Sequence, residues 1–145
     1  MPKEFVSKKL RQIAVLLEEL EMFLNVSYLE FSKNKEKIRS SERNFQLLVE
    51  QASDINSHII LELGTPRTPD NYWESFREME RLGITSRQLS KDLMKSAKLR
   101  NILIHEYDFD QDNSIFYKSV KKYMDTYESY IVAIQKYLEK KKGIE

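Results

Sequence analysis

Apolar residues recur at intervals of three and four along most of this chain, the spacing that gives an α-helix one buried face. The pattern predicts one long amphipathic helix from about residue 3, with a stripe that continues to residue 31, and a second helix at about 40–63. A polar stretch separates the stripes, and Ser40 and Ser41 supply a start signal for the second helix. The stripes are Val6, Leu10, Ile13, Leu17, Leu20, Leu24 and Phe31, then Phe45, Leu48, Ala52, Ile55, Ile59 and Leu63.

A loop with two prolines and three further helices are predicted beyond residue 63. Residues 65–70 contain both prolines and cannot continue a regular helix. A short helix is expected at about 72–82 and a longer one up to about Ile104. Glycine ends a helix readily because it reaches left-handed backbone angles without a Cβ penalty. The expected stop and capping residues are Gly64, Asp70 or Asn71, Gly83 and Ser86.

The last helix is predicted at about 114–141, after an acidic, turn-rich break at 108–113. Its apolar stripe is rich in tyrosine and is interpreted as core or dimer interface. Its Lys-rich end, 136–142, suits the negative end of a helix dipole and is interpreted as a solvated face. No strand pattern of useful length occurs. The sequence therefore predicts an all-α fold: a single domain over 1–145, core about 5–138, forming an antiparallel up-and-down bundle of four major helices plus one short one.

Composition narrows the class of protein. The chain has 145 residues, enough for one core, with 41% apolar and 32% charged residues, and no apolar run long enough to span a bilayer. A formal net charge of +1 supplies no long-range attraction to nucleic acid, so any RNA contact needs a local basic cleft. The chain has no Cys and no apolar signal segment near its start, which favours a cytoplasmic protein without membrane contact.

The candidate chemistry is concentrated in residues 100–107, where Arg100, Asn101, His105 and Tyr107 lie close together in sequence. Phosphate-binding glycine loops, metal-ligand clusters and Ser-His-Asp arrangements are all missing from the sequence, so neither a metal nor another cofactor is expected. Arginine and histidine can still carry out RNA transesterification. An imidazole titrates near neutrality and can act as base or acid, and a guanidinium can brace the phosphate oxygens.

Helical geometry restricts how Arg100 and His105 can act together. Five residues along a continuous α-helix correspond to a rotation of roughly 140°, so the two side chains would not share one face. They can converge if the helix loosens near Ile104, or if two subunits each supply one motif. A structural role is the alternative: near a helix end, these residues can satisfy one another and the last carbonyls of the helix.

The segment resembles a known family. Arg100-Asn101-Ile102-Leu103-Ile104-His105-Glu106-Tyr107 is similar to the Arg, four residues, His, one residue, Tyr signature of HepT-like proteins, the toxins of HepT–MntA systems in the HEPN superfamily. The stretches 41–60 and 72–84 resemble the second and third helices of that family. The resemblance covers roughly residues 5–135.

The resemblance implies a dimeric HEPN fold in which the motifs of two protomers face one cleft. It implies metal-independent RNA cleavage with Arg100 and His105 as the catalytic pair. It also implies neutralisation by an MntA-like minimal nucleotidyltransferase, the antitoxin of a type VII toxin–antitoxin system, which transfers AMP to Tyr107.

Further residues are candidates for supporting roles. Asn101 can orient a ligand or a partner group through its carboxamide. Asp54 and His58 are four residues apart and share one helical face, most simply as a buried or interfacial hydrogen bond. The resemblance raises the prospect that this face borders the motif, with Asp54 or Arg43 orienting it.

Three functional hypotheses follow. The first is an endoribonuclease toxin. The second is a non-catalytic subunit of a nucleotidyltransferase complex, which binds a nucleotide or presents Tyr107 as the AMP acceptor. The third is a helical dimer whose motif only stabilises the bundle. RNA cleavage by the wild type separates the first hypothesis from the second.

Overall fold

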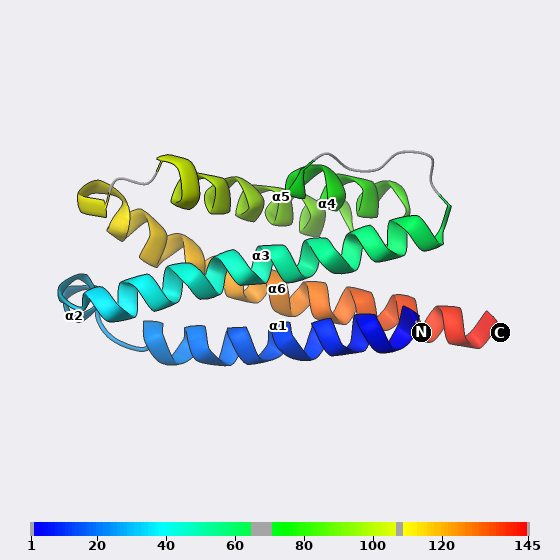
Figure 1. Cartoon of the computed structure of the whole chain (residues 1–145), viewed down its shortest axis with the longest axis horizontal. Coiled ribbons are helices and arrows are strands. Elements are labelled where there is room, and N and C mark those ends of the chain that lie inside the picture. The colour runs from blue at the N-terminus through cyan, green and yellow to red at the C-terminus, as the bar shows by residue number, and fades with distance from the viewer. Residues whose placement is uncertain (1, 65–70, 107–108, 145) are drawn as a thin grey trace.

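Four long helices lie along the length of the molecule, and two short helices complete the bundle (Figure 1). This computed structural model describes the backbone of residues 2–64, 71–106 and 109–144, and the side chains in these ranges except at residue 2 and within 105–106, 109–113 and 142–144. The elements are α1 (Pro2–Leu24), α2 (Tyr28–Lys33), α3 (Lys35–Glu62), α4 (Tyr72–Arg81), α5 (Arg87–Asn101), the π-helical turn η1 (Ile102–Glu106) and α6 (Phe109–Ile144).

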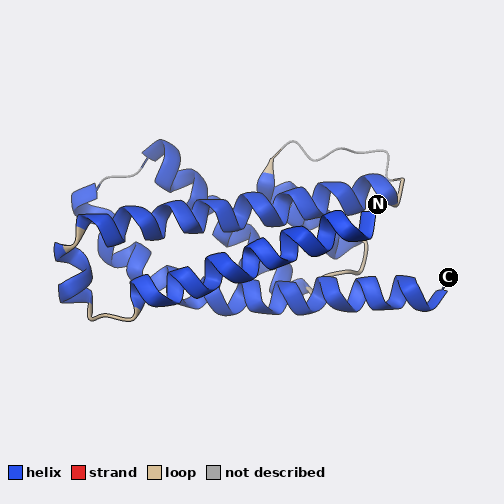
Figure 2. Cartoon of the chain, turned by 60° about the horizontal axis from the view of Figure 1, so that its bottom comes forward, coloured by secondary structure: helices blue, strands red, loops and turns tan. Residues whose placement is uncertain are grey.

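The described chain contains helices and no strands (Figure 2), so the predicted all-α bundle is confirmed. Helix α1 packs against α3 and α6, while α4 and α5 pack together and contact the other side of α3. The end of α5, the start of α6 and the short helix α2 lie at the same end of the bundle (Figure 1). The described part of the candidate motif therefore lies at one end of the molecule, and the C-terminus of α6 at the other.

The N-terminal half divides differently from the prediction. Helix α1 ends at Leu24, and Phe31 belongs to the separate helix α2. The Ser27 side chain accepts the backbone N–H of Glu30 at 3.2 Å and starts α2. Asn34, rather than a serine at 40 or 41, caps α3. The predicted start of the second helix at about residue 40 was wrong. The helix begins at Lys35, because the Asn34 side chain accepts a backbone N–H of its first turn.

The predicted acidic break at 108–113 was also wrong for residues 109–113, whose backbone is the first part of α6. Residues 107 and 108 lie outside the described residues. Asp110 and Asp112 fall in the first turns of this helix, where acidic residue types are favourable because the helix dipole is positive there.

The two glycine stops are confirmed. Gly64 and Gly83 have φ values of +70° and +78°, which are left-handed angles that glycine adopts without strain. Asn71 caps α4, as one of the two predicted alternatives. Leu63, predicted as part of the buried stripe, is 46% exposed because it follows the last residue of α3 at the end of the bundle.

The tyrosine-rich stripe of α6 forms core, as expected. Tyr127 and Tyr130 are fully buried and each hydroxyl has a partner on another helix. Tyr127 and Ser96 of α5 share a 2.7 Å hydrogen bond, and Tyr130 donates to Asn56 Oδ1 of α3 at 2.6 Å. Asn56 in turn donates to Ser75 Oγ of α4 at 3.0 Å. Burial of these hydroxyls is tolerated because they are bonded, and the bonds connect α6 to three other helices.

Alkaline pH is expected to destabilise the bundle through these tyrosines. Burial raises the pKa of the Tyr127 and Tyr130 hydroxyls above the ordinary value, so the folded protein holds these protons more tightly than the unfolded chain does. Their contribution to stability is complete below about pH 10 and is lost as pH rises beyond it. We expect the free energy of unfolding to fall by up to about 1.4 kcal/mol per pH unit for each buried tyrosine.

Urea unfolding measured between about pH 9 and 11 checks this prediction. The slope of the unfolding free energy against pH should be shallower in Tyr127→Phe than in the wild type. Tyr28→Phe, at a side chain that is 39% exposed, is the control and should keep the wild-type slope. Equal slopes in all three proteins would contradict the prediction.

Candidate functional site at the end of helix α5

Helix α5 changes its hydrogen-bonding pattern within the candidate motif. Arg100 and Asn101 are the last residues of α5, and Ile102–Glu106 continue as a single π-helical turn. A π turn bonds residues five apart rather than four, so a separation of five residues is closer to one full turn. The turn therefore reduces the angle between positions 100 and 105. A looser helix near Ile104 was one of the two ways in which Arg100 and His105 were expected to converge. Such turns occur often at functional sites.

The Arg100 guanidinium contacts residues of three helices. Its Nη2 lies 3.6 Å from Glu50 Oε2 of α3, and its Cζ lies 4.5 Å from the ring centroid of Tyr72, the first residue of α4. Its Nη1 donates to Asn101 Oδ1 at 3.2 Å. The side chain is only 16% exposed, and its buried Nε has no hydrogen-bond partner. A cation at this position is held by a carboxylate and an aromatic face rather than left in solvent.

The motif's other groups are placed only in part. His105 lies in the π turn, and its side chain is not among those described; Tyr107 lies outside the described residues. Of the three aliphatic residues between Arg100 and His105, Leu103 is buried while Ile102 and Ile104 are 38% and 41% exposed. The π turn therefore presents apolar side chains to solvent beside the candidate catalytic residues.

Among the described side chains, Asp54 and His58 contact residues of α1. Asp54 pairs with Lys9 at 3.1 Å, and the His58 ring stacks on Phe5 with 4.7 Å between centroids. No hydrogen bond between the two occurs among the described side chains, and His58 Nε2 is buried without a partner. The acidic group that meets Arg100 is Glu50, one turn before Asp54 on α3. Supporting roles for Asp54 and His58 stay predictions.

Arg43 is exposed on α3, seven residues before Glu50. Seven residues are close to two α-helical turns, so the two lie on one side of the helix. Arg43 thus shares a helix face with a residue that contacts Arg100, and its orienting role also stays a prediction.

Sequence reasoning missed Glu50 and Tyr72. Glu50 continues the four-residue spacing of Asp54 and His58 in the N-terminal direction, and this spacing was the available signal. Tyr72 was assigned to the short helix, but nothing in its neighbours pointed to Arg100, which is 28 positions away in the sequence. Both contacts depend on how α3, α4 and α5 pack.

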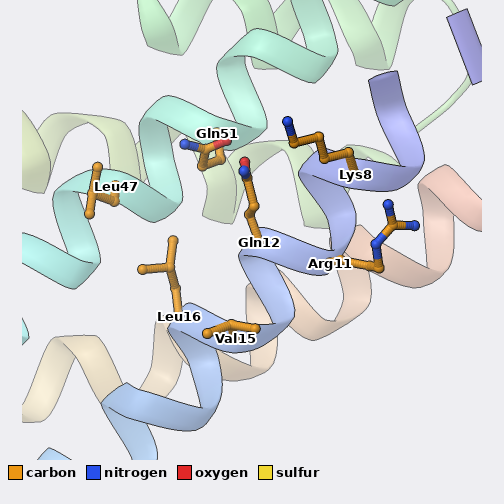
Figure 3. A pocket seen from close by; sticks show the side chains of 7 residues that line it. All are labelled: Lys8, Arg11, Gln12, Val15, Leu16, Leu47 and Gln51. Atoms are coloured by element: carbon orange, nitrogen blue, oxygen red, sulfur yellow. The ribbon is translucent and has the colours of Figure 1, made fainter. Parts of the chain in front are cut away.

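A separate surface groove lies between α1 and α3 (Figure 3). It has a volume of about 560 Å³ and a mainly apolar lining, and Gln12 and Gln51 point toward each other across it. Its lining residues are Lys8, Arg11, Gln12, Val15, Leu16, Leu47 and Gln51. None of them is a carboxylate or an imidazole.

The described part of the chain offers neither a metal site nor a membrane span. No group of three or more His, Cys, Asp or Glu side chains there is arranged to hold a metal ion. No helix within the same residues is both long enough and apolar enough to cross a membrane.

Comparisons with known proteins identify the family of this chain. The family model described as Ribonuclease HepT-like matches residues 13–134. The tRNA nuclease HepT of Aphanizomenon flos-aquae (strain 2012/KM1/D3) is 32% identical over 133 residues, which cover 92% of this chain and 89% of that protein. The chain belongs to the HepT-like family. The resemblance drawn from residues 100–107 is thereby confirmed at the level of the family.

Solved structures share the fold of this HepT-like chain. A tri-AMPylated Shewanella oneidensis HEPN toxin in complex with an MNT antitoxin matches with a TM-score of 0.82 and 22% identity, over 90% of this chain and 96% of that one. YutE, a cytosolic protein of unknown function from Bacillus subtilis, matches with a TM-score of 0.76 and 18% identity, over 93% and 91%. At these identities the matches establish the HEPN fold.

Proposed function

We propose that this HepT-like protein is the toxin of a type VII toxin–antitoxin system, acts in the cytoplasm, and cleaves RNA without a metal ion. The observation that carries the proposal is the placement of Arg100 at the end of α5, directly before the π turn that contains His105. The relative that aligns over most of both chains is a tRNA nuclease, so tRNA is the first substrate to test.

The chemistry assigned to the pair is transesterification. A base takes the proton of a ribose 2′-hydroxyl, and its oxygen attacks the adjacent phosphorus while the bond to the 5′-oxygen breaks. An acid protonates the departing 5′-oxygen, which leaves a 2′,3′-cyclic phosphate and a 5′-hydroxyl. The imidazole of His105 takes one of the two proton-transfer roles. The Arg100 guanidinium stabilises the charge that develops on the phosphate oxygens.

We further propose that two protomers share the reaction cleft as a homodimer. One imidazole cannot be base and acid in the same step, whereas two motifs facing each other supply both groups. The exposed Ile102 and Ile104 lie on the same turn as His105, where a second protomer would cover them.

A second candidate function is that of a non-catalytic subunit that presents Tyr107 to a cognate nucleotidyltransferase. It is favoured by the AMPylated toxin with the same fold and by the low exposure of Arg100. Both candidates require the same partner, an MntA-like minimal nucleotidyltransferase. They differ in whether the unmodified protein cleaves RNA.

The deciding experiment uses purified protein expressed without the neighbouring nucleotidyltransferase. We expect it to cleave tRNA in buffer containing EDTA, with products that end in 2′,3′-cyclic phosphate, because the assigned groups need no metal. Gel electrophoresis and end-group analysis measure both properties. Absence of cleavage by protein of unmodified mass would favour the second candidate, and cleavage abolished by EDTA would refute the metal-free mechanism.

A further inference from the structure

Glu50 and Tyr72 enclose the Arg100 guanidinium on two sides. Glu50 Oε2 lies 3.6 Å from Nη2, and Cζ lies over the Tyr72 ring, 4.5 Å from its centroid. Neither residue belongs to the motif, and they come from two helices, α3 and α4. Arg100 itself is on α5, so the position of its charge depends on three helices at once.

The support beneath Tyr72 is fixed by hydrogen bonds. Asn71 caps α4 by accepting the backbone N–H of Glu74 at 3.0 Å. Ser75 donates to the Tyr72 carbonyl at 2.8 Å and accepts a hydrogen bond from the buried Asn56 at 3.0 Å. Because Asn56 is fully buried and also bonded to Tyr130, the first turn of α4 is anchored to the core rather than to a surface loop.

We infer that Glu50 and Tyr72 are positioning residues that hold the Arg100 guanidinium in one orientation for an RNA phosphate, an inference that rests on the proposed function. A free arginine side chain samples many rotamers, and fixing it in advance removes that ordering cost from the reaction step. A pre-oriented cation stabilises charge that develops in the transition state without reorganising. Nη1 donates to Asn101 Oδ1 and Nη2 lies beside Glu50 Oε2, so both ends of the guanidinium have a partner.

If Glu50 instead shields Arg100 from the RNA, the cleavage rate is expected to change in the opposite direction when Glu50 is replaced. A carboxylate beside Arg100 also repels an RNA phosphate, so a shielding Glu50 would weaken RNA binding and slow cleavage. Its removal would then tighten binding and raise the rate. Positioning and shielding are therefore separated by the sign of the change in rate.

The test compares Glu50→Gln, which keeps the shape and removes the charge, with Glu139→Gln at an exposed site on α6 near the other end of the bundle. We expect Glu50→Gln to lower kcat for tRNA about 10- to 100-fold with little change in KM, since misplacing a catalytic group affects the chemical step. Glu139→Gln should match the wild type. A Glu50→Gln variant that cleaves as fast as the wild type or faster would overturn the assignment, as would one that no longer folds.

Tyr72 provides a second, independent pair of variants. Tyr72→Phe keeps the aromatic face beneath the guanidinium, whereas Tyr72→Leu keeps only an apolar side chain. We expect Tyr72→Phe to keep most of the wild-type kcat and Tyr72→Leu to have a much lower kcat. Equal losses in both variants would show that the ring does not orient Arg100.

Nuclear magnetic resonance tests the orientation of the Arg100 side chain without a cleavage assay. The Arg100 Nε–Hε signal, assigned by its loss in Arg100→Lys, should be resolved and exchange slowly in the wild type, since Nε is buried. It should broaden and exchange faster in Glu50→Gln and Tyr72→Leu, but not in Glu139→Gln. A signal that stays unchanged in all variants would overturn the inference. If the wild type does not cleave RNA, the proposed function fails, and this signal alone decides whether the two residues hold Arg100.

Discussion

Replacing His105 with alanine is expected to lower the rate of tRNA cleavage by about 10²- to 10⁴-fold, the usual contribution of a positioned acid or base. Histidine is the residue type in the motif whose unperturbed side chain changes charge near neutral pH, so arginine, asparagine and tyrosine are poor replacements for its proton transfer. Single-turnover cleavage with protein in excess measures the chemical step directly. The same experiment on Arg100→Ala should show a loss of similar size, because the guanidinium that stabilises the charge on the phosphate oxygens is missing.

The chain offers a matched control, since it contains only two histidines. His58 stacks on Phe5 at the α1–α3 seam, and its described contacts do not reach Arg100. We expect His58→Ala to lose far less activity than His105→Ala. The purely structural reading of the motif makes a different prediction: His105→Ala would lower the melting temperature by several degrees, as a lost buried network does. Cleavage of tRNA by His105→Ala at the wild-type rate would exclude the proposed mechanism.

Transfer of AMP to Tyr107 is expected to stop RNA cleavage almost completely. The modification adds a negatively charged phosphate and a bulky base two residues from His105. At an effective dielectric of about 20, two unit charges about 4 Å apart interact by about 4 kcal/mol, which corresponds to roughly three orders of magnitude in binding or rate. The bulk of the nucleotide adds steric exclusion to this repulsion.

Intact mass spectrometry and a cleavage assay check this prediction together. Toxin incubated with ATP and its cognate nucleotidyltransferase should gain mass in AMP-sized steps, and peptide mapping should place AMP on Tyr107. Tyr107→Phe should gain no AMP at that position and should continue to cleave under the same treatment. Inhibition of Tyr107→Phe to the same extent as the wild type would mean that the antitoxin acts by binding or at another residue.

The pattern of apolar residues predicted the helical bundle because each helix buries one face, and a local period of 3.6 residues is enough to reveal it. Stripe residues such as Leu20, Phe45 and Tyr130 are fully buried as expected. The pattern failed at connections, where capping side chains decide where a helix starts. Ser27 and Asn34 divided the N-terminal half into three helices, a division that the apolar stripe alone did not reveal.

Part of the candidate site could likewise be predicted from local sequence. The spacing of Arg100, His105 and Tyr107 pointed to the family, and the 140° argument required either a loosened helix or a shared cleft. The structure contains the loosened helix, as the π turn Ile102–Glu106. Sharing of the cleft between two subunits remains part of the proposed function.

The sequence by itself therefore determined the helical class, most of the core and the family, all of which depend on short-range spacing. Only the tertiary structure decided that Glu50 and Tyr72, rather than Asp54 and His58, meet the Arg100 side chain. The physical reason is that periodicity gives the face on which a residue lies but not its height along a neighbouring helix. That register is set by the packing of whole helices, here α3, α4 and α5, and it determines which charge lies opposite the arginine.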